Sequence, residues 1–260
     1  MAALQPLADA VAAIRADPGR ATVVTDFDGT LAPIVPAPPD ARPLAGAVEA
    51  LHTLAGPRPP PLARSGRPAR FLAQHLGIAA CPRLAAYGLY GMEWTDGEVI
   101  VEHADAAPWR TAVDGAAEVA ESVAPEGVWV ERKGLSVTLH VRNAPERDEW
   151  ARSWAEARAS VSGLALHPGR MSYELRPPVA VDKGTVMTDL LAGAGAACFL
   201  GDDRGDLPAF DALDRHAAAA GAAVVRVAVR SDEAPAELLE RADVVVDGPA
   251  GVLEFLRALL

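Results

Sequence analysis

The sequence predicts an α/β protein whose core is a parallel sheet covered by helices on both faces, with a smaller α/β domain inserted into it. From residue 184 onward, short β-branched runs alternate with helical patterns, which is typical of a parallel sheet buried on both sides. The segment 107–177 instead shows paired strands and helices. We therefore expect a core of residues 1–106 and 178–260 and an inserted domain of residues 107–177.

The amino-terminal part of the core is predicted to hold one strand and three helices. The run ATVVTDF predicts a short buried strand over residues 21–26. The proline-rich segment 32–43 is expected to lack regular structure. Helices are predicted over residues 4–16, from Pro43 through the following apolar run, and over residues 70–77, where Gly77 closes the helix.

The middle and end of the chain supply the remaining elements. Asp-Gly at residues 96–97 predicts a hairpin, and the alternating run 127–142 predicts two antiparallel strands around Lys133-Gly134. Helices are expected over 108–123 and 144–160, and a strand over 170–177. The terminal alternation predicts helices over 184–194, 206–216, 234–242 and 249–260, and strands over 197–203, 223–230 and 243–248.

The composition excludes several classes of protein. The net charge of −11 argues against nucleic acid or an anionic membrane as the main partner, because both attract clustered Lys and Arg. Cys81 and Cys198 match no metal or redox spacing and are expected as reduced thiols, and the scattered histidines do not suggest zinc. With no signal-peptide pattern and no apolar run of membrane-spanning length, we expect a soluble cytoplasmic protein.

Carboxylates follow two of the predicted strands directly. Asp26 and Asp28 come at the end of the first strand, and the stretch FLGDDRGD places Asp202, Asp203 and Asp206 at the end of another. In open α/β sheets the carboxyl ends of the strands form the ligand-binding edge. Five carboxylates at one edge would repel one another unless a cation joined them, and oxygen ligands without sulfur or imidazole indicate Mg²⁺.

Two further elements can contact a phosphate group. Lys183, in VDKG, precedes a predicted helix, and the Ser65 hydroxyl in RSGRP lies with its neighbouring amides near a helix start. Each element alone also fits a plainer interpretation, namely a polar turn or a solvated lysine. Their order along the chain, between and beside the two acidic strand ends, favours phosphoryl-transfer chemistry.

These four elements, DFDGT, SGR, KG and GDDRGD, resemble the four motifs of the haloacid-dehalogenase-like (HAD) phosphohydrolases. The resemblance implies a HAD-like Rossmannoid core with a cap domain inserted between the second and third motifs. It implies that Asp26 attacks phosphorus to form an aspartyl-phosphate, and that Asp28 acts as general acid and then general base. It also implies that Ser65, Gly66 and Lys183 bind the phosphate oxygens.

The same resemblance implies the ligands of the metal. Asp26, the backbone carbonyl of Asp28 and Asp202 would hold Mg²⁺, and Asp203 or Asp206 would complete the set directly or through water. The cation would neutralise the nucleophilic carboxylate so that it can approach an anionic phosphate.

More specifically, the sequence resembles the trehalose-6-phosphate phosphatase family in the stretches DFDGTLAPI, SGRP, YGLYGMEW, ERKGLSVTLHVR, YELRPPVAVDKG and FLGDDRGD. The resemblance implies hydrolysis of trehalose 6-phosphate to trehalose and phosphate, and a functional link to a trehalose-6-phosphate synthase. Carboxylates and ammonium groups suit sugar hydroxyls, although ERK also fits an exposed hairpin tip. The implied substrate-binding residues are Arg67, Glu131, Lys133, His140, Arg142 and Glu174.

Two alternatives stay open. The substrate could be another sugar phosphate such as sucrose phosphate, or the chain could be a non-catalytic sugar-phosphate-binding relative. The second alternative arises because GPRPPPLARSGRP has prolines where the family has an apolar strand before SGR. We expect either a very short, loosely paired strand before Ser65 or a local change of structure. Gly205 also stands where many relatives have a hydroxyl residue.

Overall fold

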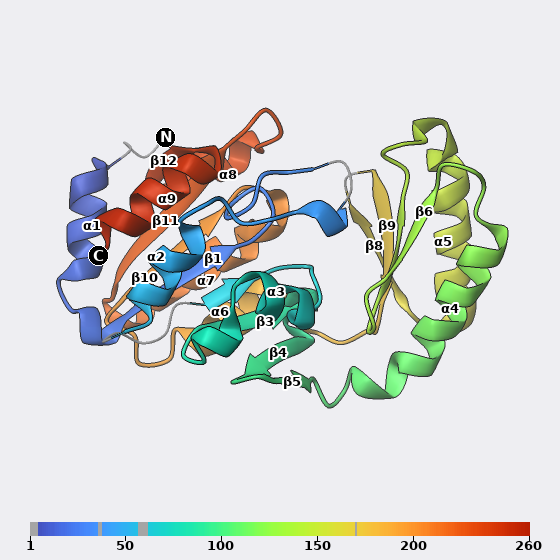
Figure 1. Ribbon diagram of the computed structural model, residues 1–260, viewed down its shortest axis with the longest axis horizontal. Helices are drawn as coiled ribbons and strands as arrows, with labels where there is room; N and C mark the ends of the chain where they lie inside the picture. Colours follow the sequence, from blue (N-terminus) through green and yellow to red (C-terminus); the bar gives the residue numbers. More distant parts are fainter. Residues whose placement is uncertain (1–4, 36–37, 57–61, 170) are drawn as a thin grey trace. The chain divides into compact units, whose positions relative to one another are not determined.

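The computed structural model describes residues 5–35, 38–56, 62–169 and 171–260 (Figure 1). The chain divides into two compact units. The core unit comprises Met1–Val101 and Val181–Leu260, and the inserted unit comprises Glu102–Ala180. Among the described residues, no helix combines the length and the apolar character needed to cross a bilayer.

The core unit is built on a mixed sheet in which parallel pairs predominate. Among the described residues the strand order is β12-β11-β10-β1-β2-β3-β4-β5. Neighbouring strands from β12 to β3 pair in parallel, and β3 pairs antiparallel with β4. The bounds are β1 Ala21–Asp26, β2 Leu62–Arg64, β3 Ala85–Gly88, β4 Glu93–Asp96, β5 Val99–Glu102, β10 Ala196–Gly201, β11 Ala223–Arg230 and β12 Val244–Asp247.

Helices cover both faces of this sheet, as the sequence predicted (Figure 1). Successive residues of β1 point to opposite faces, so Val23 joins one apolar cluster and Val24 the other. The first cluster contains buried side chains of α1, α2, α3 and α9, and the second those of α6, α7 and α8. The bounds are α1 Leu7–Arg15, α2 Ala47–Leu54, α3 Ala69–His75, α6 Lys183–Leu190, α7 Leu207–Ala220, α8 Ala236–Arg241 and α9 Gly248–Ala258.

The segment after β1 departs from the predicted pattern. Helix α2 begins at Ala47 and not at Pro43, because Gly46 adopts a φ of 90° and the Leu44 amide bonds the Leu31 carbonyl at 2.8 Å. A short 3₁₀ turn, Pro38–Asp40, also lies in the stretch expected to lack regular structure. Residues 36 and 37 of that stretch, and residue 4 of the first predicted helix, lie outside the described residues.

In its described residues, the inserted unit is a four-stranded antiparallel sheet with two helices against one face. Its order is β6-β7-β9-β8, and its helices contribute Val113 and Ala155 to an apolar cluster with Leu139 and Leu175 of the strands. Strand β8 was not predicted, because its sequence ALHPG contains proline and glycine; both are tolerated in an edge strand. The bounds are α4 Arg110–Val123, β6 Trp129–Arg132, β7 Val137–His140, α5 Asp148–Ser162, β8 Ala165–Gly169 and β9 Ser172–Arg176.

Candidate active site

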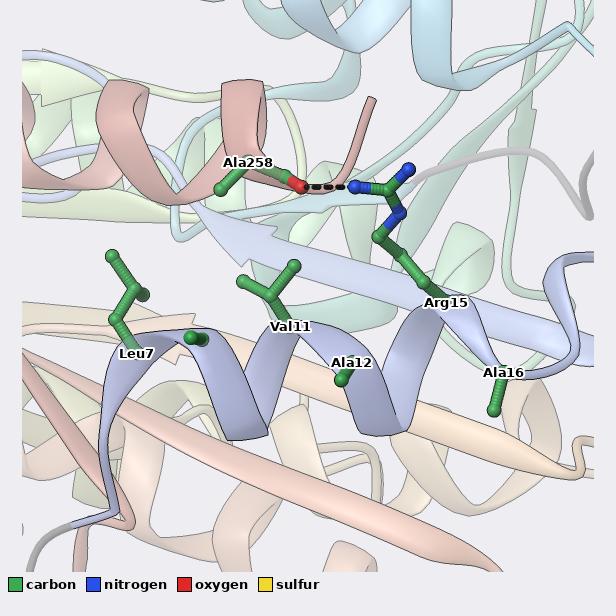
Figure 2. Close-up of a pocket in the computed structure, with 7 residues that line it drawn as sticks. Leu7, Val11, Ala12, Arg15, Ala16 and Ala258 are labelled. Carbon is green, nitrogen blue, oxygen red and sulfur yellow. Dashed lines mark hydrogen bonds between the residues drawn. The ribbon is translucent and has the colours of Figure 1, made fainter.

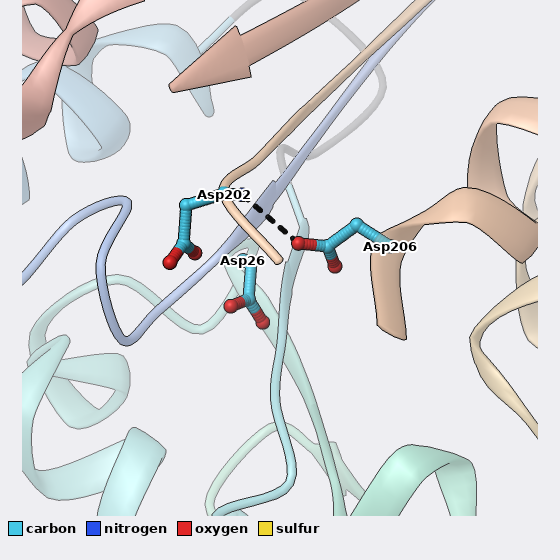
Figure 3. Close-up of side chains that lie close together, drawn as sticks. All are labelled: Asp26, Asp202 and Asp206. Carbon is cyan, nitrogen blue, oxygen red and sulfur yellow. Dashed lines mark hydrogen bonds between the residues drawn. The ribbon is translucent and has the colours of Figure 1, made fainter. Parts of the chain in front are cut away.

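Three buried carboxylates meet at the carboxyl ends of two adjacent strands. Asp26 ends β1, Asp202 follows β10, and Asp206 lies in the 3₁₀ turn that leads into α7. One oxygen atom of each lies within 4.8 Å of the others. Figure 3 shows the three side chains close together. Because β1 and β10 pair in parallel, residues that are distant in sequence reach the same sheet edge.

Two glycines, Gly29 and Gly201, leave the space that the Asp202 and Asp206 carboxylates occupy. At Gly29, with φ of 76°, a Cβ atom would lie 2.0 Å from Asp202 Oδ2. At Gly201 a Cβ would lie 2.4 Å from Asp206 Oδ2. Thr30 Oγ1 then donates to Asp202 Oδ1 at 3.1 Å, which ties the loop after β1 to the end of β10.

Asp206 is held by backbone amides and by a lysine. Its Oδ2 accepts from the amides of Asp202 at 3.0 Å and Asp203 at 3.2 Å, and its Oδ1 accepts from Lys183 Nζ. The same Lys183 Nζ donates to Asp26 Oδ1 at 3.0 Å. The structure therefore brings Lys183 to the acidic group, as the sequence motifs predict.

The start of α6 places this lysine. Asp182 is the N-cap residue, and its Oδ1 accepts from the amides of Gly184 and Thr185, both at 2.8 Å. Thr185 Oγ1 returns the interaction by bonding the Asp182 amide at 3.0 Å. This reciprocal capping fixes the first turn of the helix, at whose first position Lys183 lies.

The group carries more negative than positive charge. Burial raises the pKa of Asp26 well above its ordinary value, against the opposing effect of Lys183, and the carboxylates of Asp206 and Asp202 raise it further. Burial and the neighbouring carboxylates likewise raise the pKa of Asp202 to about 8. Burial raises the pKa of Asp206 to about 6, although Lys183 lowers it. An oxygen-only donor set with this excess of negative charge could hold a hard divalent metal ion.

Of the two carboxylates that the sequence left open as the last metal ligand, the structure brings Asp206 into the group. Asp203 is exposed, and its side chain accepts from the amide of Asp206.

The carboxylate of Asp28 also lies outside the three-membered group. It accepts hydrogen bonds from Arg67 Nε at 2.8 Å and Nη2 at 2.6 Å. Arg67, expected to bind substrate, thus fixes the orientation of Asp28.

Ser65 follows a strand of three residues. Strand β2 pairs in parallel with both β1 and β3, so the expectation of a very short strand is correct, but the strand is paired on both sides. The prolines at 57 and 59–61 lie outside the described residues.

The Ser65 hydroxyl accepts from the Arg67 amide at 3.1 Å. Next to it, a Cβ at Gly66 would lie 2.7 Å from the Tyr90 hydroxyl oxygen, so a side chain there would collide with that ring.

Within the inserted unit, four of the predicted sugar-binding residues lie together. Lys133 Nζ is 3.4 Å from Glu174 Oε1 and 3.6 Å from Glu131 Oε2, and His140 Nε2 is 2.8 Å from Glu131 Oε2. Ser136 Oγ donates to Glu174 Oε1 at 2.6 Å. Together, the five form the polar cluster of the inserted unit. Arg142 follows β7 and its side chain is exposed.

Sequence reasoning missed several polar residues of both groups. Arg64 is fully buried beside the acidic group, and the signal that could have found it is a charged residue in a strand of apolar residues. Thr30 and Ser136 carry no such signal, because hydroxyl residues are common in turns. Trp129, whose ring stacks on His140 with centroids 4.7 Å apart, was part of an alternating strand and drew no separate prediction.

A hollow elsewhere on the core unit contains none of these residues. It has a volume of about 730 Å³ and is lined by one side of α1 and by the end of α9 (Figure 2). Its residues are Leu7, Ala8, Val11, Ala12, Arg15, Ala16 and Ala258.

The fold of this chain is shared by solved structures of the haloacid dehalogenase-like class. A haloacid dehalogenase-like hydrolase from Bacteroides thetaiotaomicron has the same fold, with a TM-score of 0.64 at 16% identity over 92% of this chain and 99% of that one. The model of the trehalose-phosphatase family matches residues 24–243, and the chain belongs to that family.

Relatives of known name agree with this assignment. The trehalose-phosphate phosphatase of Mycobacterium tuberculosis H37Rv is 37% identical over 245 residues. That match includes 90% of this chain but 59% of the relative, so the chain spans about three fifths of the relative's length. The C-terminal domain of the Candida albicans trehalose-6-phosphate phosphatase shares the fold, with a TM-score of 0.75 at 22% identity over 98% of this chain and 97% of that one.

Proposed function

We propose that this chain is a Mg²⁺-dependent phosphatase that hydrolyses trehalose 6-phosphate to trehalose and phosphate through an aspartyl-phosphate, as part of trehalose biosynthesis. The observation that carries the proposal is the position of Asp26 in a chain of the trehalose-phosphatase family. Its buried carboxylate lies at the end of β1, 3.0 Å from Lys183 Nζ and within reach of Asp202. Such a carboxylate is placed to attack phosphorus.

The residues that would hold Mg²⁺ are Asp26, Asp202 and the backbone carbonyl of Asp28, with Asp206 bound directly or through water. The fit is supported by the closeness of the three carboxylates and by their raised pKa values, which burial and the neighbouring carboxylates cause. When bound, the ion would supply the charge that keeps Asp26 ionised beside an anionic phosphate.

Other residues of the core bind the phosphate group and transfer protons. Lys183, Ser65 and the Gly66 amide bind the non-bridging phosphate oxygens, where negative charge is concentrated in the transition state. Asp28 protonates the leaving sugar oxygen and then accepts a proton from the attacking water. Arg67 holds the Asp28 carboxylate by two hydrogen bonds, so Asp28 presents one orientation to the leaving oxygen.

The inserted unit, in this proposal, is a cap that recognises the sugar. Its polar cluster has two carboxylates, an ammonium and an imidazole on one face of a sheet whose other face packs on helices. Charge-assisted hydrogen bonds from such groups suit sugar hydroxyls. The hydroxyl of Thr138, which is 2% exposed, has no hydrogen-bond partner within the described structure and adds a further polar atom beside Glu131 and Glu174.

Phosphate release from a panel of sugar phosphates tests this function. Trehalose 6-phosphate should be turned over faster than sucrose 6-phosphate or glucose 6-phosphate, and removing Mg²⁺ with a chelator should abolish the reaction. If glucose 6-phosphate is turned over as fast, the substrate assignment is wrong. Release of phosphate from no ester would support a sugar-phosphate-binding relative, and equilibrium binding to the Asp26→Asn variant would then identify its ligand.

We also infer a small-molecule substrate in the cytoplasm rather than a nucleic-acid or membrane partner. The net charge of −11 supports this inference, because polyanions and anionic lipids would repel such a surface. A functional link to a trehalose-6-phosphate synthase follows from the substrate itself, since an enzyme must form the phosphate ester that this one removes. Assay of both activities in one extract would test that link.

A further inference from the structure

We propose that Arg64 is a positioning residue, which fixes Lys183 against Asp26 and joins the start of α6 to the turn that holds Ser65. The inference rests on the proposed phosphatase function for its kinetic consequence. Its geometric basis, however, lies wholly in the core unit and can be tested without substrate.

Strand register places the Arg64 side chain on the face of the sheet that α6 covers. Arg64 of β2 lies opposite Asp26 of β1 and Tyr87 of β3, and residues in register on neighbouring strands point to the same face of a sheet. Val24, two residues before Asp26, belongs on this face to the same apolar cluster as Met187 of α6. Arg64 therefore points toward the layer that contains α6, at whose first position Lys183 lies.

The guanidinium bonds backbone carbonyls of two separate segments. Arg64 Nη1 donates to the carbonyl of Lys183, and Nη2 lies 3.3 Å from the carbonyl of Asp182 and 3.4 Å from that of Tyr90. Asp182 and Lys183 begin α6, whereas Tyr90 belongs to the turn after β3. A planar group with several donors can join such carbonyls, which an aliphatic side chain cannot do.

The third carbonyl links this arrangement to the phosphate-binding turn. Tyr90 adopts a φ of 62°, its amide bonds the Ser65 carbonyl at 3.1 Å, and its ring leaves space for no side chain at Gly66. Arg64 thus joins the start of α6, which carries Lys183, to the turn whose Tyr90 amide bonds the Ser65 carbonyl. Holding both through one side chain fixes their separation, which a reaction centre needs.

Stability alone does not account for Arg64. The side chain is 0% exposed, its Nε has no hydrogen-bond partner in the described part of the chain, and burial lowers its pKa to about 10. Burying a charge and an unpaired donor disfavours folding, and an apolar side chain of similar size would avoid both costs. The neighbouring carboxylates of Asp206 and Asp26 offset part of the cost, and they belong to the acidic group itself.

Lys183 needs such an anchor because its own stem is flexible. Four methylene groups separate its backbone from Nζ, so the position of the ammonium depends on where the backbone is held. Asp182 fixes the amide side of this turn through its cap, and Arg64 fixes the carbonyl side. Because the two constraints come from different residues, Asp182 and Arg64, a single substitution removes only one of them.

The experiment compares Arg64→Met, Arg64→Lys and the control Arg70→Met, whose arginine is exposed on α3. We expect Arg64→Met to lower kcat by roughly tenfold or more with a much smaller change in KM. Arg64→Lys should restore part of the loss, and Arg70→Met should match the unmodified protein. In parallel, amide hydrogen exchange over residues 183–187 should be faster in Arg64→Met, and melting temperatures report whether each variant folds.

Chemical rescue separates positioning from general damage. In Arg64→Ala, millimolar guanidinium should raise kcat, whereas urea at the same concentration, a neutral molecule of similar shape, should not. Unchanged kcat or unchanged exchange over 183–187 in Arg64→Met would overturn the proposal, as would equal recovery of Arg64→Ala with urea and with guanidinium.

Two remaining outcomes are also decisive. If Arg64→Met does not fold, Arg64→Lys decides, since a folded lysine variant with unchanged kcat and exchange contradicts the proposal. If the unmodified protein releases no phosphate from any ester, the proposed function fails, and the exchange measurement alone still decides whether Arg64 holds the start of α6.

Discussion

The acidic group of the core and the polar cluster of the inserted unit both bury carboxylates, but they balance charge differently. In the core, the ammonium of Lys183 pairs with two of the three carboxylates, those of Asp26 and Asp206, and burial raises the pKa values of Asp202 and Asp206 to about 8 and about 6. In the inserted unit, burial alone would raise the pKa of Glu174, yet Lys133, Arg176 and the Ser136 hydroxyl bring it below its ordinary value.

This difference teaches what each group is suited to bind. Burial and neighbouring carboxylates raise the pKa values in the core group, so that group could hold a cation. A carboxylate whose pKa is lowered already has its counter-charge, and its remaining acceptor capacity suits neutral donors such as hydroxyls. The contrast supports a metal and phosphate site in the core and a sugar site in the inserted unit.

The largest expected effect comes from the nucleophile. Asp26→Asn keeps the shape of the side chain but removes the carboxylate that attacks phosphorus, so phosphate release should fall by at least about 10³-fold. Asp40→Asn, in an exposed turn, provides the matched control and should keep full activity. Activity of Asp26→Asn within a few-fold of the unmodified protein would contradict the assignment of the core group as the reaction centre.

Removing the ammonium from the core should damage stability as well as activity. Lys183→Met leaves Asp26 and Asp206 without their shared buried partner, which we expect to cost about 3–5 kcal/mol of unfolding free energy in metal-free buffer. Denaturant titration measures the loss. Adding Mg²⁺ should recover a larger share in this variant than in the unmodified protein, and equal gains would argue that the ion binds elsewhere.

In the inserted unit, charge removal should change recognition more than chemistry. Glu174→Gln keeps the size of the side chain but weakens its bonds with Lys133 and Ser136. We expect KM for trehalose 6-phosphate to rise about tenfold, equivalent to about 1.4 kcal/mol, with little change toward a small aryl phosphate. Glu121→Gln, which alters an exposed pair with Arg132, is the control. A loss shared by both substrates would contradict a sugar-binding role.

The smallest effect concerns pH and the cation. Because the folded-state pKa values of Asp202 and Asp206 lie above the ordinary carboxylate value, the folded state binds the extra protons. The stability these two groups contribute is full below pH 4 and is lost as pH rises through about 6 and about 8. Saturating Mg²⁺ should therefore raise the melting temperature by about 5 °C at pH 8 and by less at pH 5, as thermal scans would show. A larger gain at pH 5 would contradict this account.

Much of the site could be predicted because its residues lie where local patterns change. The β-branched run that ends at Asp26 and the apolar run that ends before Asp202 each predict a strand, and parallel strands bring such ends to one edge. Lys183 could be found in the same way, since Asp182 begins a helix with a recognisable cap.

Other features could not be predicted, because they depend on side chains from segments far apart in the sequence. The choice between Asp203 and Asp206 depends on how the turn after β10 folds back, which buries one carboxylate and exposes the other. The edge strand β8 is stabilised by its pairing with β9, and its own residues do not favour a strand. The pairing of Arg67 with Asp28 likewise joins two loops that have no local reason to meet.

The sequence by itself determined most of the strands and helices, the family and the carboxylates that end the strands, since periodicity and motif spacing are local properties of the chain. Only the tertiary structure decided which charges are buried together, and it revealed that the Arg64 guanidinium bonds the Lys183 carbonyl. The physical reason is that a charge's free energy depends on its burial and its neighbours, and the packing of distant segments sets both.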